Sequence, residues 1–401
     1  MKSTQHLFLL FILLLLSCGT DDNDVTTKPI KEPDNKLLSF TKITDVSLEE
    51  LKTSFSFAFP GVSSTVIDKN DLVPVTAYKI TYQTQHPYSE KTFTTASGLV
   101  IVPESDDALP IVSYQHGTIS DNDEVPSNFV EHSQTRDYLS VFSGLEYILI
   151  APDYLGYGES NQFLHPYEHG PTLAVSSFDM LQAAKEFLDE QSIIYNEKLF
   201  LAGYSEGGYA TMAMHHYIEN ETDLNVTSSF VGGGAYNKTL FAKEIMQKDE
   251  PLNFIPNYLW VLFTYNNIYN INEPFSFYIN EPYASNINVL NFLELDQIST
   301  NPQELFTENF RNIIINEENH PIIDALKDND RFDWNPIGNV HFIHGENDNF
   351  VFPSNATTAF EAMRSGEANE HITLSLLEGK NHFESGSIFA LTVPHLINGL
   401  R

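Results

Sequence analysis

The most constraining feature of this sequence is a series of short apolar runs that do not alternate with polar residues. Strands buried on both faces, as in a parallel sheet, have this character. A stretch with apolar residues near helical spacing, 173–188, lies between two of the runs. Strands that alternate with helices predict an α/β fold with a mostly parallel, doubly wound sheet. The runs are residues 111–114, 147–151, 199–202, 229–231, 340–343 and 372–377.

Other segments of the chain differ from these runs. Residues 75–84 and 92–102 have the composition of β-strands and are expected to be leading antiparallel strands of the sheet. Residues 237–335 are rich in Asn and aromatic residues and break the rhythm, with Pro256 suited to the first residue of a helix through residue 269. We interpret 237–335 as a mostly helical cap inserted between core segments 41–236 and 336–401. Its aromatic residues are expected mainly in the cap core, with some facing a pocket.

The N-terminus has the character of an export signal. An apolar run at residues 7–16 follows Lys2 and is too short to span a bilayer comfortably. Cys18 is the only cysteine and so cannot form an internal disulfide. Residues 15–18 resemble a bacterial lipobox, which implies removal of a signal peptide (1–17) and lipidation of Cys18. The alternative is an ordinary signal peptide followed by an incidental cysteine.

The segment after Cys18 bears on where the protein resides. Residues 18–40 are polar and are expected to form a flexible tether. The acidic stretch 19–24 resembles the surface-export signals of Bacteroidota lipoproteins, which implies an exported lipoprotein held at the outer membrane or cell surface. The formal net charge of −33 makes nucleic acid an unfavourable partner and is otherwise explained by solubility.

Ser205 is the expected nucleophile. It lies at the centre of Gly-Tyr-Ser-Glu-Gly, residues 203–207, between the apolar run 199–202 and a helix-like stretch 209–218. A strand, a glycine-flanked serine and a helix are the context of a nucleophile elbow, in which a strained turn presents the hydroxyl. The alternative is a structural turn with an incidental serine.

A serine needs a base to take its proton and an acid to orient that base. Downstream of Ser205, the run 340–343 leads into His-Gly-Glu-Asn-Asp, which places Asp348 at the acid position and leaves Glu346 as a rival. The last run, 372–377, is followed by His382, the expected base. Three other histidines lie in or beside strands and are expected to be structural: His341, His344 and His371.

The oxyanion hole is expected to use two backbone N–H groups, those of Glu206 and Thr118. Thr118 belongs to the loop 115–118, where His116 is expected to hold the loop in place. Asp153, after another strand, is expected to be scaffold. The adjacent histidines 215 and 216 do not have metal-ligand spacing, and the glycines at 232–234 lack a phosphate-loop lysine, so no metal or cofactor is expected.

Together, the motifs at residues 115–118, 152–158, 165–167 and 203–208 resemble the secretory-lipase branch of the α/β-hydrolase superfamily and its bacterial lipoprotein relatives. The resemblance extends from about residue 75 to the C-terminus. It implies hydrolysis of a small-molecule or lipid ester beneath a helical cap, through an acyl-enzyme on Ser205. The alternatives are a serine peptidase on the same fold and an inactive lipoprotein that only binds at a surface.

Overall fold

The computed structural model describes residues 35–58, 71–89, 92–131, 133–287, 298–365 and 370–400. Its strands form one nine-stranded sheet in the order β1-β2-β3-β5-β4-β6-β7-β8-β9. The strands are β1 Leu37–Val46, β2 Val75–Gln85, β3 Phe93–Pro103, β4 Leu109–Gln115, β5 Ile148–Pro152, β6 Tyr195–Tyr204, β7 Ser228–Gly232, β8 Asn339–Gly345 and β9 Ile372–Leu377.

The strand directions agree with the prediction for the segments that were expected to be strands. Strands β1, β2 and β3 pair antiparallel, and β3 joins β5 in the same way. All pairs from β5 through β4, β6, β7 and β8 to β9 are parallel. The six continuous apolar runs are these parallel strands, so the α/β prediction is confirmed.

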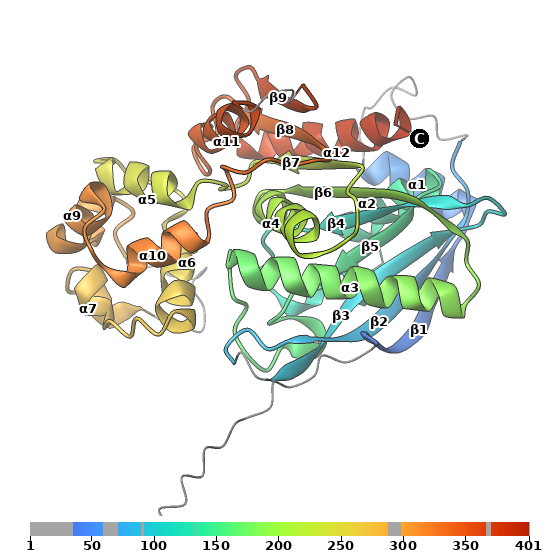
Figure 1. The fold of residues 1–401 in the computed structure, drawn as a ribbon, viewed down its shortest axis with the longest axis horizontal. Helices are drawn as coiled ribbons and strands as arrows, with labels where there is room; N and C mark the ends of the chain where they lie inside the picture. Colours follow the sequence, from blue (N-terminus) through green and yellow to red (C-terminus); the bar gives the residue numbers. More distant parts are fainter. Residues whose placement is uncertain are drawn as a thin grey trace, which may run out of the picture. The chain divides into compact units, whose positions relative to one another are not determined.

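Helices cover both faces of the sheet (Figure 1). Helices α3, Gly170–Glu190, and α4, Glu206–Glu221, pack on one face, where Phe187 and Met214 join an apolar cluster with strand residues. Helices α1, Leu48–Ala58, α2, Gln134–Gly144, and α12, His382–Asn398, contribute to a second cluster on the other face. Helix α11, Ser354–Arg364, packs against β8 and β9. The core is therefore a three-layer α/β sandwich.

The segment between β7 and β8 is a helical cap, as predicted. Figure 1 shows its helices gathered beside the sheet. Helix α6 begins at Ile255, one residue before the expected start at Pro256, and Pro256 lies in its first turn. The cap has an apolar cluster of its own, which includes Leu259, Tyr265, Phe306 and Phe310. Its helices are α5 Lys238–Gln247, α6 Ile255–Ile268, α7 Phe275–Tyr278, α8 Pro302–Leu305, α9 Glu308–Asn316 and α10 Pro321–Asp328.

One boundary of the sequence interpretation is wrong. The tether was expected to extend to residue 40, whereas β1 begins at Leu37 and pairs antiparallel with β2. The backbone N–H groups of Lys36 and Leu37 donate to the Glu186 carboxylate, at 3.0 and 2.8 Å. The pairing has two register irregularities, between residues 37 and 39 and between 42 and 44. The earlier part of the tether, the expected signal peptide and Cys18 lie outside the described residues.

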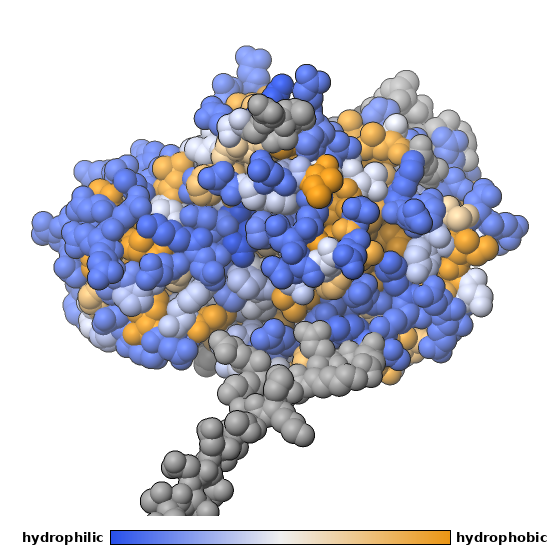
Figure 2. Space-filling model, in the orientation of Figure 1, coloured by the Kyte–Doolittle hydropathy of each residue, from blue (hydrophilic) through white to orange (hydrophobic). Residues whose placement is uncertain are grey.

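In the described ranges, no helix combines the length and apolar character needed to cross a bilayer. The face shown in Figure 2 is mostly hydrophilic, and its apolar side chains form small separate groups. The expected lipid anchor at Cys18 stays a prediction.

Candidate active site

Ser205 occupies the sharp turn between β6 and α4, with φ 60° and ψ −125°. Two glycines allow the chain to pack this tightly. A Cβ on Gly203 would lie 2.2 Å from the carbonyl oxygen of Gly207, and one on Gly207 would lie 2.1 Å from that of Gln115. The Ser205 N–H donates to the Gly232 carbonyl oxygen on β7 at 2.8 Å. This geometry is that of a nucleophile elbow.

The structure brings the three predicted triad side chains into one hydrogen-bonded chain. Nδ1 of His382 lies 2.7 Å from Oδ2 of Asp348, and Nε2 lies 2.9 Å from Oγ of Ser205. An ionised carboxylate only accepts, so Nδ1 carries the proton and Nε2 is free to accept from the serine hydroxyl. Asp348 and His382 are buried, whereas Ser205 is half-buried.

The backbone and a neighbouring ring fix the position of His382. The Tyr204 hydroxyl donates to the His382 carbonyl oxygen at 2.6 Å. The Phe350 ring lies parallel to the imidazole, with centroids 5.5 Å apart and an interplanar angle of 7°. These contacts limit rotation of the base, whose ring must point one nitrogen at Asp348 and the other at Ser205.

Asp348 accepts more hydrogen bonds than the triad requires. Its Oδ1 accepts from the backbone N–H groups of Phe350 and Val351, at 2.9 and 3.0 Å. Nε2 of His344 donates to the Val351 carbonyl oxygen at 2.8 Å and lies 3.3 Å from Asp348 Oδ2. Burial raises the pKa of Asp348, but the contacts with His344 and His382 outweigh burial and hold the pKa well below its ordinary value.

The rival acid and the other histidines are placed elsewhere. Glu346 is exposed, and its carboxylate accepts from the backbone N–H of Gly379 at 3.1 Å. His341 stacks on Phe230, and Nε2 of His371 contacts the Pro336 carbonyl oxygen at 3.0 Å. Only His344 differs from the expectation for these histidines, because it contacts the triad acid. Sequence reasoning missed this role, although His344 and Asp348 are the two ends of the motif at residues 344–348.

The loop after β4 lies against the elbow, as expected for an oxyanion loop. A Cβ on Gly117 would lie 3.3 Å from the Tyr204 carbonyl oxygen and 3.8 Å from the Ser205 Cβ. His116 holds the loop, since its Nδ1 contacts the Gly117 carbonyl oxygen at 2.7 Å and its ring stacks on Tyr154. The loop is therefore adjacent to the nucleophile, and the assignment of the Thr118 and Glu206 N–H groups as oxyanion donors stays a prediction.

Asp153 is a buried structural carboxylate at the end of β5. Its oxygens accept from the Ser127 N–H at 2.9 Å, from the Ser127 hydroxyl at 2.6 Å and from the Ser97 hydroxyl at 2.5 Å. Burial raises its pKa, while these hydrogen bonds act in the opposite direction. Asp153 therefore connects three segments of the scaffold, in agreement with the expectation.

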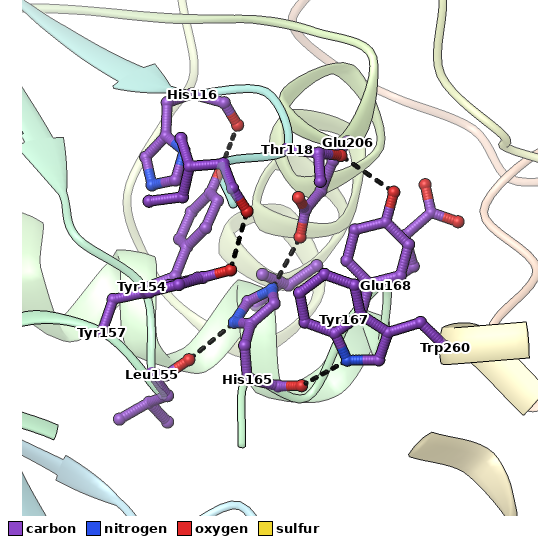
Figure 3. Close-up of polar contacts among 12 residues, drawn as sticks. His116, Thr118, Tyr154, Leu155, Tyr157, His165, Tyr167, Glu168, Glu206 and Trp260 are labelled. Carbon is purple, nitrogen blue, oxygen red and sulfur yellow. Dashed lines mark hydrogen bonds and ion pairs between the residues drawn. The ribbon is translucent and has the colours of Figure 1, made fainter. Parts of the chain in front are cut away.

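A second buried histidine–carboxylate pair lies beside the elbow (Figure 3). Nε2 of His165 lies 2.7 Å from Oε1 of Glu206, and both side chains are buried. Glu206 was predicted only for its backbone N–H, and His165 was noticed only as part of the motif at 165–167. Their contact spans 41 residues and has no local sequence signal.

Ser205 opens into a pocket formed largely by the cap. Phe254, Tyr258 and Tyr265 of the cap contribute to its wall, so some of the cap aromatics do face the pocket. The charged residues in the wall are Glu168 and Lys238, which form a buried ion pair with each other. The other wall residues are Tyr167, Phe241, Ala242, Ile245, Met246, Asn257, Val261, Leu262, Phe306, Phe310, Ile314, Ile322, Leu326 and Val351.

The described residues contain no group of three or more His, Cys, Asp or Glu side chains placed to hold a metal ion. His215 instead contacts the Ser229 hydroxyl and Glu219, each at 2.9 Å. Ser205, His382 and Asp348 bring a hydroxyl, an imidazole and a carboxylate together beside the pocket. This set can carry out nucleophilic attack with general acid–base assistance.

Comparison with known proteins gives matches among solved structures. No protein-family model matches the chain, and no curated protein sequence matches it. A provisionally assigned hydrolase from Legionella pneumophila is 26% identical, with a TM-score of 0.78, over 90% of this chain and 97% of that one. The rice cell wall degrading esterase LipA from Xanthomonas oryzae is 20% identical, with a TM-score of 0.75, over 91% and 97% of the two chains. Candida antarctica lipase A is 14% identical, with a TM-score of 0.62, over 86% and 77%.

Proposed function

The chain has the α/β-hydrolase fold, and on this premise we propose that it is a serine hydrolase that cleaves carboxylic esters. The observation that carries the proposal is the chain of hydrogen bonds from Ser205 through His382 to Asp348. These residues follow the carboxyl ends of three parallel strands, β6, β9 and β8, and Ser205 faces a largely apolar pocket. Ligands of open α/β sheets bind at this edge.

The proposed reaction has two half-reactions. Oγ of Ser205 attacks the ester carbonyl carbon and gives its proton to Nε2 of His382, and the carbonyl oxygen becomes an oxyanion held by the Glu206 and Thr118 N–H groups. The bond to the alcohol then breaks, and His382 returns the proton to the leaving oxygen. Water attacks the acyl-enzyme with His382 again as base, which releases the carboxylic acid and restores Ser205. Asp348 holds the Nδ1–H tautomer and stabilises the imidazolium.

The preference for esters rests on two observations. LipA is described as an esterase and the Candida antarctica protein as a lipase. The pocket wall is mostly aliphatic and aromatic, which favours an apolar acyl or alcohol group in the substrate. Both observations support the cleavage of an ester with at least one apolar side.

The experiment is a comparison of wild-type protein with Ser205→Ala. We expect a fluorophosphonate probe to label only the wild type, and the wild type to hydrolyse p-nitrophenyl esters in a series from acetyl to long acyl. Aminoacyl amides are assayed in parallel, as are hydroxycinnamoyl esters. A wild-type protein that neither reacts with the probe nor cleaves any ester would rule out the proposal. Faster cleavage of amides than of esters would replace it with a peptidase.

We also propose that Cys18 carries a lipid anchor and places the enzyme at the outer membrane or cell surface. The support is the apolar run 7–16 followed by the only cysteine of the chain. Several acyl chains would hold the protein far better than one. We expect the wild type to fractionate with membranes and Cys18→Ala to be soluble after export. Membrane fractionation of the Cys18→Ala protein would contradict the anchor.

A further inference from the structure

The two residues predicted to supply the oxyanion donors are both held through their side chains by one short loop. The loop is residues 165–167, before α3. His165 contacts the Glu206 carboxylate at 2.7 Å, and the Tyr167 hydroxyl contacts the Thr118 hydroxyl at 2.8 Å (Figure 3). Glu206 and Thr118 come from different parts of the chain, so the loop connects the two sides of the expected oxyanion hole.

The contact with Glu206 is strongly directional. Nδ1 of His165 lies 2.6 Å from the Leu155 carbonyl oxygen, which only accepts, so this nitrogen carries a proton. Nε2 faces Oε1 of Glu206, and the contact requires one further proton between them. Each side chain is only 2% exposed, so neither group can turn away without leaving a buried polar atom unpaired. The pair therefore fixes the first residue of α4, directly after Ser205.

The contact with Thr118 is part of a longer chain. The Asn257 side-chain amide donates to the Tyr167 oxygen at 3.0 Å, which leaves the tyrosine proton available for Oγ1 of Thr118. Burial raises the pKa of Tyr167, so the phenol remains protonated in this chain. The Tyr167 hydroxyl and the Asn257 amide therefore hold the side chain of Thr118 in place.

The cap helix α6 contacts both ends of the loop 165–167. Asn257 belongs to α6, and so does Trp260, whose Nε1–H donates to the His165 carbonyl oxygen at 3.2 Å. The indole also stacks on Tyr167, with centroids 4.5 Å apart and an interplanar angle of 14°. The loop conformation thus depends on the cap as well as on the core.

The backbone around the loop has little freedom to adopt another arrangement. A Cβ on Gly156 would lie 2.3 Å from the Cα of His165, so the loop lies directly on this glycine. Glu168, which follows the loop, has φ 51°, a conformation that costs a non-glycine residue energy. The Tyr265 hydroxyl of the cap donates to the Glu168 carbonyl oxygen at 3.0 Å.

We propose that residues 165–167 are a positioning element that sets the two oxyanion donors, and that seating of helix α6 holds this element in place. The inference rests on the proposed function, because only a reaction through an oxyanion needs these donors. Loss of one such donor costs roughly 10²–10³ in kcat, so a small displacement of either N–H group has a large effect on rate. His165 and Tyr167 act through Glu206 and Thr118.

The central test is Tyr167→Phe, which removes the bonds to Thr118 and Asn257 while the ring can still stack on Trp260. We expect kcat to fall by roughly 10- to 100-fold, less than for complete loss of a donor, with KM little changed. A trifluoromethyl ketone with the acyl group of the substrate forms a tetrahedral adduct with Ser205. Its inhibition constant should rise by the same factor as kcat/KM falls, because both report binding of the oxyanion.

Tyr278→Phe is the matched control. Like Tyr167→Phe, it removes a tyrosine hydroxyl, in this case one within the cap that donates to Asn266 at 2.6 Å. Tyr278 is not part of the pocket wall. Trp260→Phe is a second test variant, because it removes the bond to His165 while Trp260 also lies outside that wall. We expect Trp260→Phe to lower kcat and Tyr278→Phe to leave kcat unchanged at similar thermal stability. The second variant keeps the inference testable if Tyr167→Phe does not fold.

Three results would overturn the inference while the wild type hydrolyses esters. The first is an unchanged kcat in both Tyr167→Phe and Trp260→Phe. The second is a loss of kcat in these variants while the trifluoromethyl ketone inhibits them as strongly as the wild type. The third is a loss of kcat in Tyr278→Phe equal to that in the test variants. A wild-type protein without esterase activity would instead overturn the proposed function, and this inference with it. The wild-type assay therefore separates the two failures.

Discussion

The buried ion pair between Lys238 and Glu168 leads to a quantitative prediction. Lys238 is the first residue of cap helix α5, and Glu168 follows the loop 165–167 in the core. Their side chains are 3% and 10% exposed, and the Lys238 ammonium also lies 3.6 Å from the centre of the Tyr209 ring. Burial lowers the pKa of Lys238 and raises that of Glu168, with each partner acting against the shift of the other. The pair is thus costly to bury and dependent on both members.

The perturbation is Lys238→Met, Glu168→Met and the double variant. Removing one member of a buried pair leaves an unpaired charge and typically costs about 3–5 kcal/mol, whereas replacing both by apolar residues is often neutral or stabilising. With an unfolding entropy of about 2.1 cal/mol/K per residue, this loss lowers Tm by roughly 4–6 °C for a chain of this length. We expect each single variant to lose about this much, and the double variant to unfold near the wild-type temperature.

The assay is thermal unfolding of all four proteins at several pH values. In Glu168→Met the remaining lysine has a folded pKa below its ordinary 10.5, so the unfolded state binds more protons and the deficit shrinks as pH rises toward 10.5. In Lys238→Met the remaining carboxyl has a folded pKa above 4.5, so the deficit shrinks as pH falls toward 4.5. Additive losses in the double variant, or parallel pH profiles of the two single variants, would refute the reasoning.

Three further predictions concern the triad and the elbow. Asp348→Asn is expected to lower kcat about 10⁴-fold because the amide disturbs the tautomer of His382, while Glu346→Gln leaves kcat unchanged. If Glu346→Gln instead lowered kcat more than Asp348→Asn in an ester assay, Glu346 would be the triad acid. Ser205→Gly should be inactive and about 1 kcal/mol more stable than Ser205→Ala, because the positive φ of residue 205 costs alanine but not glycine; lower stability of the glycine variant on unfolding would contradict this strain. Asp348 has a folded pKa below 3.8, so its contribution to stability is present above pH 3.8 and is lost as pH falls below it. The measurement is the difference in unfolding free energy between wild type and Asp348→Asn as a function of pH. A decrease of this difference already at pH 5 would contradict the contacts of the Asp348 carboxylate.

The sequence was sufficient to predict that Ser205, Asp348 and His382 lie close together, because each of them follows an apolar run. Carboxyl ends of neighbouring parallel strands meet at one edge of a sheet, so residues placed directly after such strands come together in space. Ser205 and Asp348 follow β6 and β8, and His382 follows β9. Strand type and chain order therefore carried enough information for these side chains, and also for the helical cap inserted between β7 and β8.

Other features depend on contacts that no local pattern encodes. His165 meets Glu206, 41 residues further along the chain, only because the loop before α3 folds over the elbow. Residues 37–40, the first part of β1, were interpreted as the end of the tether because the segment before them is polar and has no periodicity. The extent of β1 is fixed by pairing with β2 and by the bonds from Lys36 and Leu37 to Glu186, which are tertiary contacts.

The construction of β1 also has a consequence for molecules that meet one another. An edge strand presents unpaired backbone groups, which can pair with a strand of a second molecule and begin aggregation. In β1 the pairing with β2 is interrupted twice, and the exposed strand carries the Lys42–Asp45 ion pair. Bulges and charges of this kind make an edge a poor template for another strand. Two copies of the chain that meet at this edge would therefore be poorly matched for pairing strand to strand.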